Sequence, residues 1–310
     1  MLDRILPVSP RVRRACAAAL AVAALWLAPG DALSSAADPP ASSPSAERAR
    51  TDACGPLVGK PGGGHWQCTF VDNFNGTALD TSKWALQDTV KSGFRSGLTC
   101  YRGGENVAVR DGTLRLTARD LGHPVDCSNP YGQFLTRYTG GLVTTRNSFT
   151  QTYGRFEVRA RFPTARTAGV HGAFWMYPPQ LKYGQWPASG EIDVAEWWSS
   201  DPQTVLPTLH YNGRNFHADS GWGCQVADVS SFHTYRVEWY RTGMRFFVDN
   251  ALCFSRKWRP DPPQEFPQPF DHPFGMILNM GVGTAAGTNR VTEETQLPAT
   301  FVVDYARAWK

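Results

Sequence analysis

Short runs of β-forming residues, separated by turn-forming residues, fill most of this sequence and constrain its fold more than any other feature. Many runs alternate apolar and polar residues with a period of two, which is typical of half-buried strands. No stretch longer than ten residues has a convincing apolar period of 3.6, so long amphipathic helices are not expected. The pattern predicts an all-β sandwich. The expected strands span residues 106–109, 113–118, 141–145, 154–162, 172–176, 204–211, 234–240, 244–248 and 276–282.

Two turn signals predict β-hairpins within this pattern. Arg110, Asp111 and Gly112 separate two alternating runs, and Asp249-Asn250 follows the apolar run 246–248. Asp, Asn and Gly favour the tight turns that connect antiparallel strands. Antiparallel neighbours are therefore expected at both places.

Residues 186–198 carry three carboxylates in an otherwise apolar run bracketed by tryptophans. Glu191 and Asp193 share one face of the expected strand, because side chains alternate along a strand. Glu196 is out of phase, and one extra residue, as in a β-bulge, would return it to that face. The two glutamates would then lie roughly 5–7 Å apart, a range that includes the carboxyl separation of retaining glycoside hydrolases. The alternative is an exposed acidic edge strand, which the tight acid spacing disfavours.

Segment 191–196 resembles the signature of glycoside hydrolase family 16, in the longer, bulged form of laminarinase-like members. The likeness covers about residues 66–310 and includes, in order, segments 70–84, 153–157, 173–176, 232–239 and 301–307. The resemblance implies a jelly-roll sandwich of two curved antiparallel sheets, with a substrate cleft across the concave face. It also implies that Glu191 is the nucleophile and Glu196 the acid/base, with Asp193 hydrogen-bonded to the nucleophile. Closely spaced carboxylates cannot all ionise freely, so one is expected to stay protonated near neutral pH.

Several further residues are candidates for substrate binding. Trp175 and Trp186 match family positions beside the acidic strand, and polysaccharide clefts tend to be lined by aromatic side chains that stack on sugar rings. Trp197 is a weaker candidate of the same kind, together with Trp198 and Trp222. His210 is either a site residue or a core histidine, and Asn279 is a candidate hydrogen-bonding partner for sugar. Tryptophans expected in the core are Trp84, Trp239, Trp258 and Trp309.

The resemblance implies a secreted, endo-acting, retaining β-glycosidase that cleaves a neutral β-linked polysaccharide, with β-1,3-glucan as the leading substrate. Many laminarinase-like members carry a Gly-Gly-x-Trp stretch where residues 281–287 here contain no tryptophan. Endo-β-1,3-galactanase, mixed-linkage β-glucanase and transglycosylase activities therefore stay open, as does a non-catalytic carbohydrate-binding protein on the same fold. No cofactor is expected for catalysis. Asp304 matches a position that often joins a structural calcium site.

The N-terminal residues are expected to direct export. Residues 1–37 combine a basic start, an apolar stretch at 15–28 and small residues at 34–37, which is typical of a signal peptide; a retained membrane anchor is the alternative. Residues 38–65 are expected to be a flexible leader and N-terminal extension, and residues 66–310 the catalytic domain. The product is expected to be extracellular, monomeric and free of the membrane.

Charge and cysteine content agree with this expectation. Without residues 1–37 the chain has 27 basic and 25 acidic residues, and this near-neutral balance gives no electrostatic footprint for nucleic acid. Six cysteines remain, which indicates disulfides in an exported chain. The spacings of zinc sites are absent. Of the fifteen possible pairings, sequence proximity favours Cys54–Cys68, Cys100–Cys127 and Cys224–Cys253.

Overall fold

The computed structural model describes residues 50–310, so the expected signal peptide and the start of the leader lie outside the described residues. The described chain is almost entirely β-sheet, with one four-residue helix, α1 (Thr89–Ser92), which begins after the N-cap residue Asp88. Within this part of the chain, no helix has the length and apolar character needed to span a membrane.

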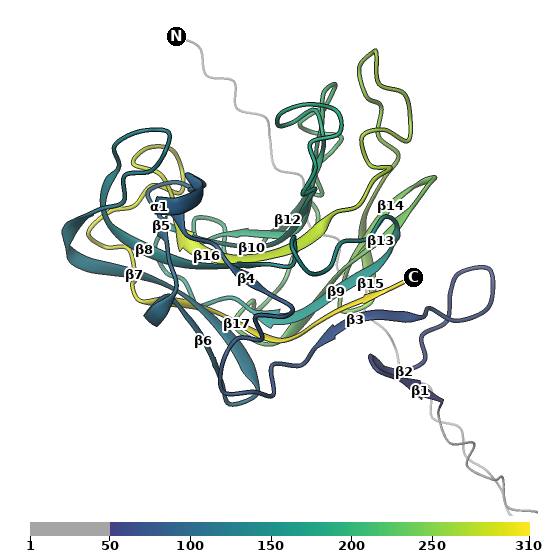
Figure 1. The fold of residues 1–310 in the computed structure, drawn as a ribbon, viewed down its shortest axis with the longest axis horizontal. Coiled ribbons are helices and arrows are strands. Elements are labelled where there is room, and N and C mark those ends of the chain that lie inside the picture. Colours follow the sequence, from purple (N-terminus) through teal and green to yellow (C-terminus); the bar gives the residue numbers. More distant parts are fainter. Residues whose placement is uncertain (1–49) are drawn as a thin grey trace, which may run out of the picture. The chain divides into compact units, whose positions relative to one another are not determined.

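The strands form two curved layers (Figure 1). The first layer runs in the order β12 (Val205–His210), β11 (Glu191–Trp198), β10 (Val170–Tyr177), β16 (Gly275–Val282) and β8 (Leu135–Thr144), with β4 (Ala85–Leu86) beside β8. The second layer runs in the order β15 (Ala251–Arg256), β14 (Gly243–Val248), β13 (His233–Tyr240), β9 (Gly154–Arg161) and β17 (Ala299–Trp309). The other side of β17 pairs with β7 (Thr113–Asp126) and β3 (Cys68–Asp72), and β6 (Val107–Arg110) pairs with β7.

The two layers are joined through β7 and β8. The first half of β7 pairs with β17 in the second layer, and its second half pairs with β8 in the first. All described pairings are antiparallel except that of β5 (Cys100–Tyr101) with β8. The result is a nearly closed antiparallel sheet folded into two layers, and the predicted all-β jelly roll is confirmed.

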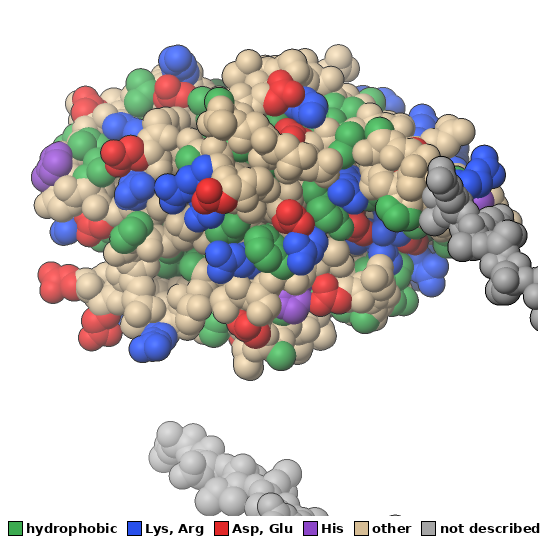
Figure 2. Space-filling view, turned by 90° about the horizontal axis from the view of Figure 1, so that it is seen from below, with side chains coloured by type: hydrophobic (Ala, Val, Ile, Leu, Met, Phe, Trp, Pro, Cys, Tyr) green, Lys and Arg blue, Asp and Glu red, His purple; other side chains and the backbone are tan. Residues whose placement is uncertain are grey.

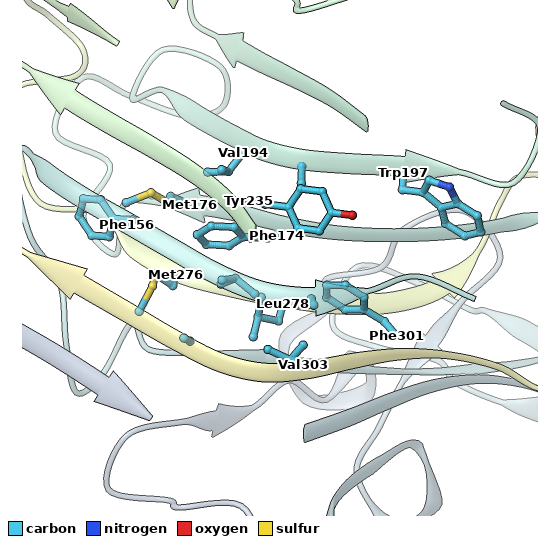
Figure 3. Packing of buried hydrophobic residues seen from close by; sticks show 14 of the residues in the cluster. Phe156, Phe174, Met176, Val194, Trp197, Tyr235, Met276, Leu278, Phe301 and Val303 are labelled. Carbon is cyan, nitrogen blue, oxygen red and sulfur yellow. The ribbon is translucent and has the colours of Figure 1, made fainter. Parts of the chain in front are cut away.

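The core lies between the layers because each central strand turns one set of alternate residues inward. Phe174 and Met176 of β10 and Leu278 of β16 meet Phe156 of β9 and Phe301 of β17 in one cluster (Figure 3). Complete burial of a side chain of this size contributes about 1.5–3 kcal/mol. The four tryptophans predicted for packing are all at most 2% exposed, which confirms their core placement: Trp84, Trp239, Trp258 and Trp309.

Both predicted hairpin turns are present. Asp111 and Gly112 connect β6 to β7 with φ angles of +52° and +67°, and Asp249 and Asn250 connect β14 to β15 with φ angles of +47° and +69°. Two consecutive positive φ angles define the turn whose twist matches that of the flanking strands.

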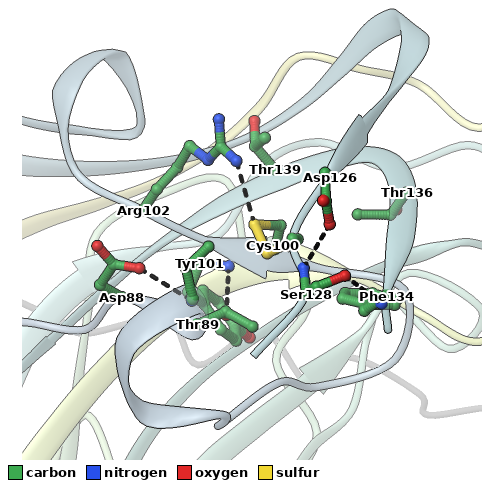
Figure 4. The surroundings of a disulfide bond; sticks show 12 residues. Asp88, Thr89, Cys100, Tyr101, Arg102, Asp126, Ser128, Phe134, Thr136 and Thr139 are labelled. Atoms are coloured by element: carbon green, nitrogen blue, oxygen red, sulfur yellow. Dashed lines mark hydrogen bonds between the residues drawn. A yellow bond between two sulfur atoms is a disulfide. The ribbon is translucent and has the colours of Figure 1, made fainter. Parts of the chain in front are cut away.

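All three predicted disulfides are present, with Cα–Cα distances of 5.6, 6.1 and 5.1 Å for the Cys54, Cys100 and Cys224 pairs. Cys54 lies in the turn of a short hairpin of β1 (Thr51–Asp52) and β2 (Gly55–Pro56), and its bond to Cys68 ties this hairpin to β3. The described part of the N-terminal extension thus belongs to the compact unit that begins at Arg48. Figure 4 shows the surroundings of the Cys100–Cys127 disulfide, which joins β5 to the segment after β7. Beside it, the backbone N–H of Tyr101 on β5 donates a hydrogen bond to the Thr89 hydroxyl of α1.

Figure 2 shows basic and acidic side chains interspersed over the face seen from below. On β9 and β13 a separate set of charged side chains forms a buried network, in which Arg155 contacts Glu157 at 2.5 Å and Arg236 lies 3.6 Å from Glu238. This network lies in the second layer, apart from the acids of β11.

Candidate active site

Strand β11 presents all three acids on one face of the first layer. Its register shifts against β12 between Asp193 and Glu196, and against β10 at the same place, where one extra residue is inserted. This β-bulge returns Glu196 to the face that carries Glu191 and Asp193, as predicted from the sequence. The opposite face enters the core with Ile192, Val194 and Ala195.

The acids line a cleft of about 600 Å³ on the exposed face of the first layer. Odd-numbered residues of β10 and β16 form its floor, because the even-numbered ones point into the core. Loops from distant parts of the sequence form its sides. From the two floor strands, the lining includes His171, Ala173, Trp175 and Tyr177 of β10 and Ile277 and Asn279 of β16. From the loops, it includes Phe94, Arg95, Arg146, Pro178 and Trp186.

His210 bridges two of the acids. Its Nε2 lies 2.9 Å from Asp193 Oδ2 and 3.8 Å from Glu191 Oε1, while its Nδ1 lies 3.4 Å from Arg214 Nη1. A guanidinium only donates, so Nδ1 is the accepting nitrogen and Nε2 carries the proton toward the carboxylates. Among the described residues no hydrogen bond joins Asp193 to Glu191, and His210 Nε2 lies within 4 Å of both carboxylates instead. His210 is therefore a site residue rather than a core histidine.

Burial and mutual repulsion raise the proton affinity of this acid pair. Burial, followed by the charge of Asp193, raises the pKa of Glu191 to about 8. Asp193 is buried more deeply, and burial followed by the charge of Glu196 raises its pKa well above the usual range. Asp193, the more deeply buried of the two, is the acid that burial most favours in its protonated form. When Asp193 is neutral, its charge no longer contributes to the raised pKa of Glu191. Two contacts oppose this rise in the pKa of Glu191: the charge of His210, and the Trp186 indole N–H, which donates to Glu191 Oε2 at 3.0 Å.

Glu196 has a partner of its own, His171, which was not predicted from the sequence. His171 Nε2 lies 3.2 Å from Glu196 Oε1, and its ring stacks on Trp198 at a centroid distance of 4.1 Å. His171 Nδ1 is buried without a protein partner, so the proton belongs on Nε2, where it is donated to Glu196. The signal was present in the sequence: His171 shares the period-two face of β10 with Trp175.

Trp175 and Trp186 both line the cleft, as predicted, on opposite sides of β11. Trp186 is 55% exposed. Trp175 is partly buried and is held by Asn279, whose oxygen accepts a hydrogen bond from the indole N–H at 2.8 Å and whose amide donates to Tyr101 at 3.2 Å. Asn279 is only 2% exposed, so it positions Trp175 rather than offering its own amide to a sugar. Phe94 extends this aromatic surface by stacking on Trp175 at 5.9 Å.

Two predicted site residues lie elsewhere. Trp197 is fully buried in the core, stacks on Phe162 at 5.2 Å and cannot contact a sugar (Figure 3). The bulge that returns Glu196 to the cleft face sends the next residue to the other face, so the prediction for Trp197 is wrong. Asp304 lies on β17, where its Oδ2 contacts Arg159 at 2.6 Å. Its carboxylate has a cationic partner there, and the calcium site expected at Asp304 stays a prediction.

The shifted carboxyls predict how stability depends on pH. The pKa of Glu191 rises from 4.5 to about 8 and that of Asp193 also rises, so the folded state binds more protons than the unfolded state in this window. Stability is therefore expected to fall as the pH increases from 4.5 to 8. Glu191→Gln removes one of these groups. The stability gained over the wild type, measured as the free energy of unfolding, should therefore be larger at pH 8 than at pH 5, by about 3 kcal/mol.

Thermal unfolding at the two pH values measures this difference. Glu265→Gln is the matched control, because Glu265 is an exposed carboxylate outside the cleft. The same pH dependence in both variants would contradict the assignment.

A cluster of acids on the concave face of a β-sandwich, between aromatic side chains, is the arrangement of a polysaccharide-cleaving glycoside hydrolase. The comparison with protein families agrees: the model of glycosyl hydrolases family 16 matches residues 94–307, and the chain belongs to this family. Glycosidases of this family generally need no cofactor for catalysis.

Characterised relatives cover most of the described chain. The β-glucanase of Rhodothermus marinus is 34% identical over 257 residues, which span 79% of this chain and 86% of that protein. The glucan endo-1,3-β-glucosidase A1 of Niallia circulans is 34% identical over 265 residues, which span 79% of this chain but only 37% of that longer protein. The X-ray structure of the laminarinase from Rhodothermus marinus matches with a TM-score of 0.65 over 79% of this chain and 98% of that one.

Proposed function

We propose that the protein is a secreted, endo-acting, retaining β-glycosidase that hydrolyses β-1,3-glucan. The observation that carries this proposal is the bulge in β11, which places Glu191 and Glu196 on one face of the cleft with Asp193 between them. A protein that only binds sugar needs the aromatic residues but has no use for three acids gathered in its cleft. Export as a monomer through a signal peptide at residues 1–37 is part of the same proposal.

The two glutamates would act in sequence. Ionised Glu191 attacks the anomeric carbon while protonated Glu196 gives its proton to the glycosidic oxygen, so the bond to the leaving sugar breaks and a glycosyl ester forms. Glu196, now a carboxylate, takes a proton from water, whose oxygen attacks the same carbon and releases Glu191. The Trp186 indole N–H orients Glu191 through its Oε2, and the N–H at His171 Nε2 holds Glu196 by donating to its Oε1. Two inversions leave the β configuration unchanged.

Two observations support a β-1,3-glucan substrate. The cleft is open and lined on both sides of the acids by aromatic rings, which suits a neutral chain that passes through it. The relatives are named as laminarinase and glucan endo-1,3-β-glucosidase. The lack of a tryptophan in segment 281–287 favours tolerance of a second linkage, as in mixed-linkage β-glucan.

Incubation of the protein with β-1,3-glucan, mixed-linkage glucan and β-1,3-galactan tests this function. We expect the mean chain length of β-1,3-glucan to fall early, with oligosaccharides of several sizes, because an open cleft binds the middle of a chain. Proton NMR of the first products should show the β anomer. Release of single sugars from chain ends, first products with the α anomer, or preferential cleavage of galactan would each contradict the proposal.

A further inference from the structure

An exposed aromatic cluster lies beside the cleft but outside its lining. Phe216 and Trp222, in the loop after β12, are 54% and 46% exposed, and their ring centroids are 5.1 Å apart. His217 contacts both rings. Among the exposed Phe, Tyr and Trp side chains of residues 50–310, Phe216 and Trp222 are the only pair in ring contact.

The loop that carries this cluster is firmly held. The fully buried carboxylate of Asp219 accepts hydrogen bonds from the Tyr211 hydroxyl and the backbone N–H of Asn215, both at 2.7 Å, and from the Arg256 guanidinium. The disulfide of Cys224 joins the end of the loop to β15. A fixed loop therefore presents two large rings to solvent, where they gain nothing from burial.

A short series of side-chain contacts connects the cluster to the catalytic acids. The ring of His210 lies 5.7 Å from that of Trp186 in the cleft. Arg214 contacts His210 at 3.4 Å, and its guanidinium lies over the Phe216 ring at 5.1 Å. The aromatic surface of the cleft thus continues past β12, the edge strand of the first layer, onto the loop.

We propose that Phe216 and Trp222 form a platform that binds the same glucan chain beyond the end of the cleft; this inference rests on the proposed function. The apolar faces of pyranose rings stack on aromatic rings, and two adjacent rings offer such a surface to consecutive sugars. A protein partner fits less well, because a stable interface needs about 800 Å² per partner, far more than two side chains provide. The platform would favour long chains over short ones.

The test compares long β-1,3-glucan with an aryl oligosaccharide short enough to fill only the cleft. For Trp222→Ala, the ratio of kcat/KM on the long substrate to that on the short one is expected to fall about tenfold, the worth of one good aromatic contact. Phe216→Ala should act in the same direction. Trp222→Phe keeps a ring at this position and should retain most of the ratio.

His65→Ala is the control, because His65 is an exposed ring in the N-terminal extension, which the Cys54–Cys68 disulfide ties to β3 of the second layer. Its ratio should match that of the wild type. Affinity electrophoresis in gels that contain the long glucan, with each substitution placed in a Glu191→Gln background, measures binding without turnover.

An unchanged ratio, or equal losses on both substrates, would overturn the platform while leaving the proposed function intact. Failure of the wild type to cleave either glucan would instead overturn the proposed function. In that case the gel assay still decides whether the platform binds glucan.

Discussion

Glu191→Gln is expected to lower kcat on β-1,3-glucan by about 10⁴-fold or more, because loss of a covalent nucleophile removes both steps of a double displacement. Glutamine preserves the shape of the side chain and can still accept the hydrogen bond from Trp186. Initial rates measured as reducing ends test this directly. The variant should also be at least as stable as the wild type at pH 8, since a buried acid has been removed.

The thermal unfolding of the same sample separates chemistry from folding. An inactive but stable protein supports the nucleophile assignment, and Glu265→Gln should keep wild-type turnover as the exposed control. Wild-type activity in Glu191→Gln would show that another group attacks the sugar.

Glu196→Ala is expected to lower kcat on glucan by about 10²–10⁴-fold, the usual contribution of a general acid–base group. An aryl glycoside with an activated leaving group needs little protonation, so the first step should survive and the glycosyl ester should accumulate. Azide needs no general base and should restore turnover by giving a β-glycosyl azide. Mass spectrometry of the stalled protein and NMR of the azide product check both points.

His171→Gln is the matched comparison, because glutamine can still donate to Glu196. It should not respond to azide, since Glu196 itself remains. Azide rescue of Glu191→Gln but not of Glu196→Ala would exchange the two roles.

The sequence predicted those parts of the site that depend on local alternation. Glu191, Asp193 and Glu196 were placed on one face because a strand has a period of two and a bulge changes it once. The same rule, carried one residue further, puts Trp197 in the core, so that error came from incomplete use of the pattern. His171 could also have been found from its register with Trp175 on β10.

Other features depend on contacts between distant segments and could not be predicted. Asn279 holds Trp175 because β16 lies next to β10, and strand order is not visible in a single sequence. The carboxylate of Asp304 lies against Arg159 because β17 pairs with β9. The disulfides were predictable because each joins cysteines at most 29 residues apart, so proximity along the chain was enough.

The position of β17 in the second layer has a consequence for how the protein is made. This strand, the last one described, pairs with β7 and β3 on one side and β9 on the other, so it completes a layer whose other strands were synthesised much earlier. Until residues 299–309 leave the ribosome, β7 and β9 keep unpaired edges, and pairings between such distant segments form slowly. The nascent chain therefore cannot complete its second layer until translation reaches this strand. A chain in that state can be threaded through a translocation channel, which suits the proposed export, but needs protection from aggregation on the way.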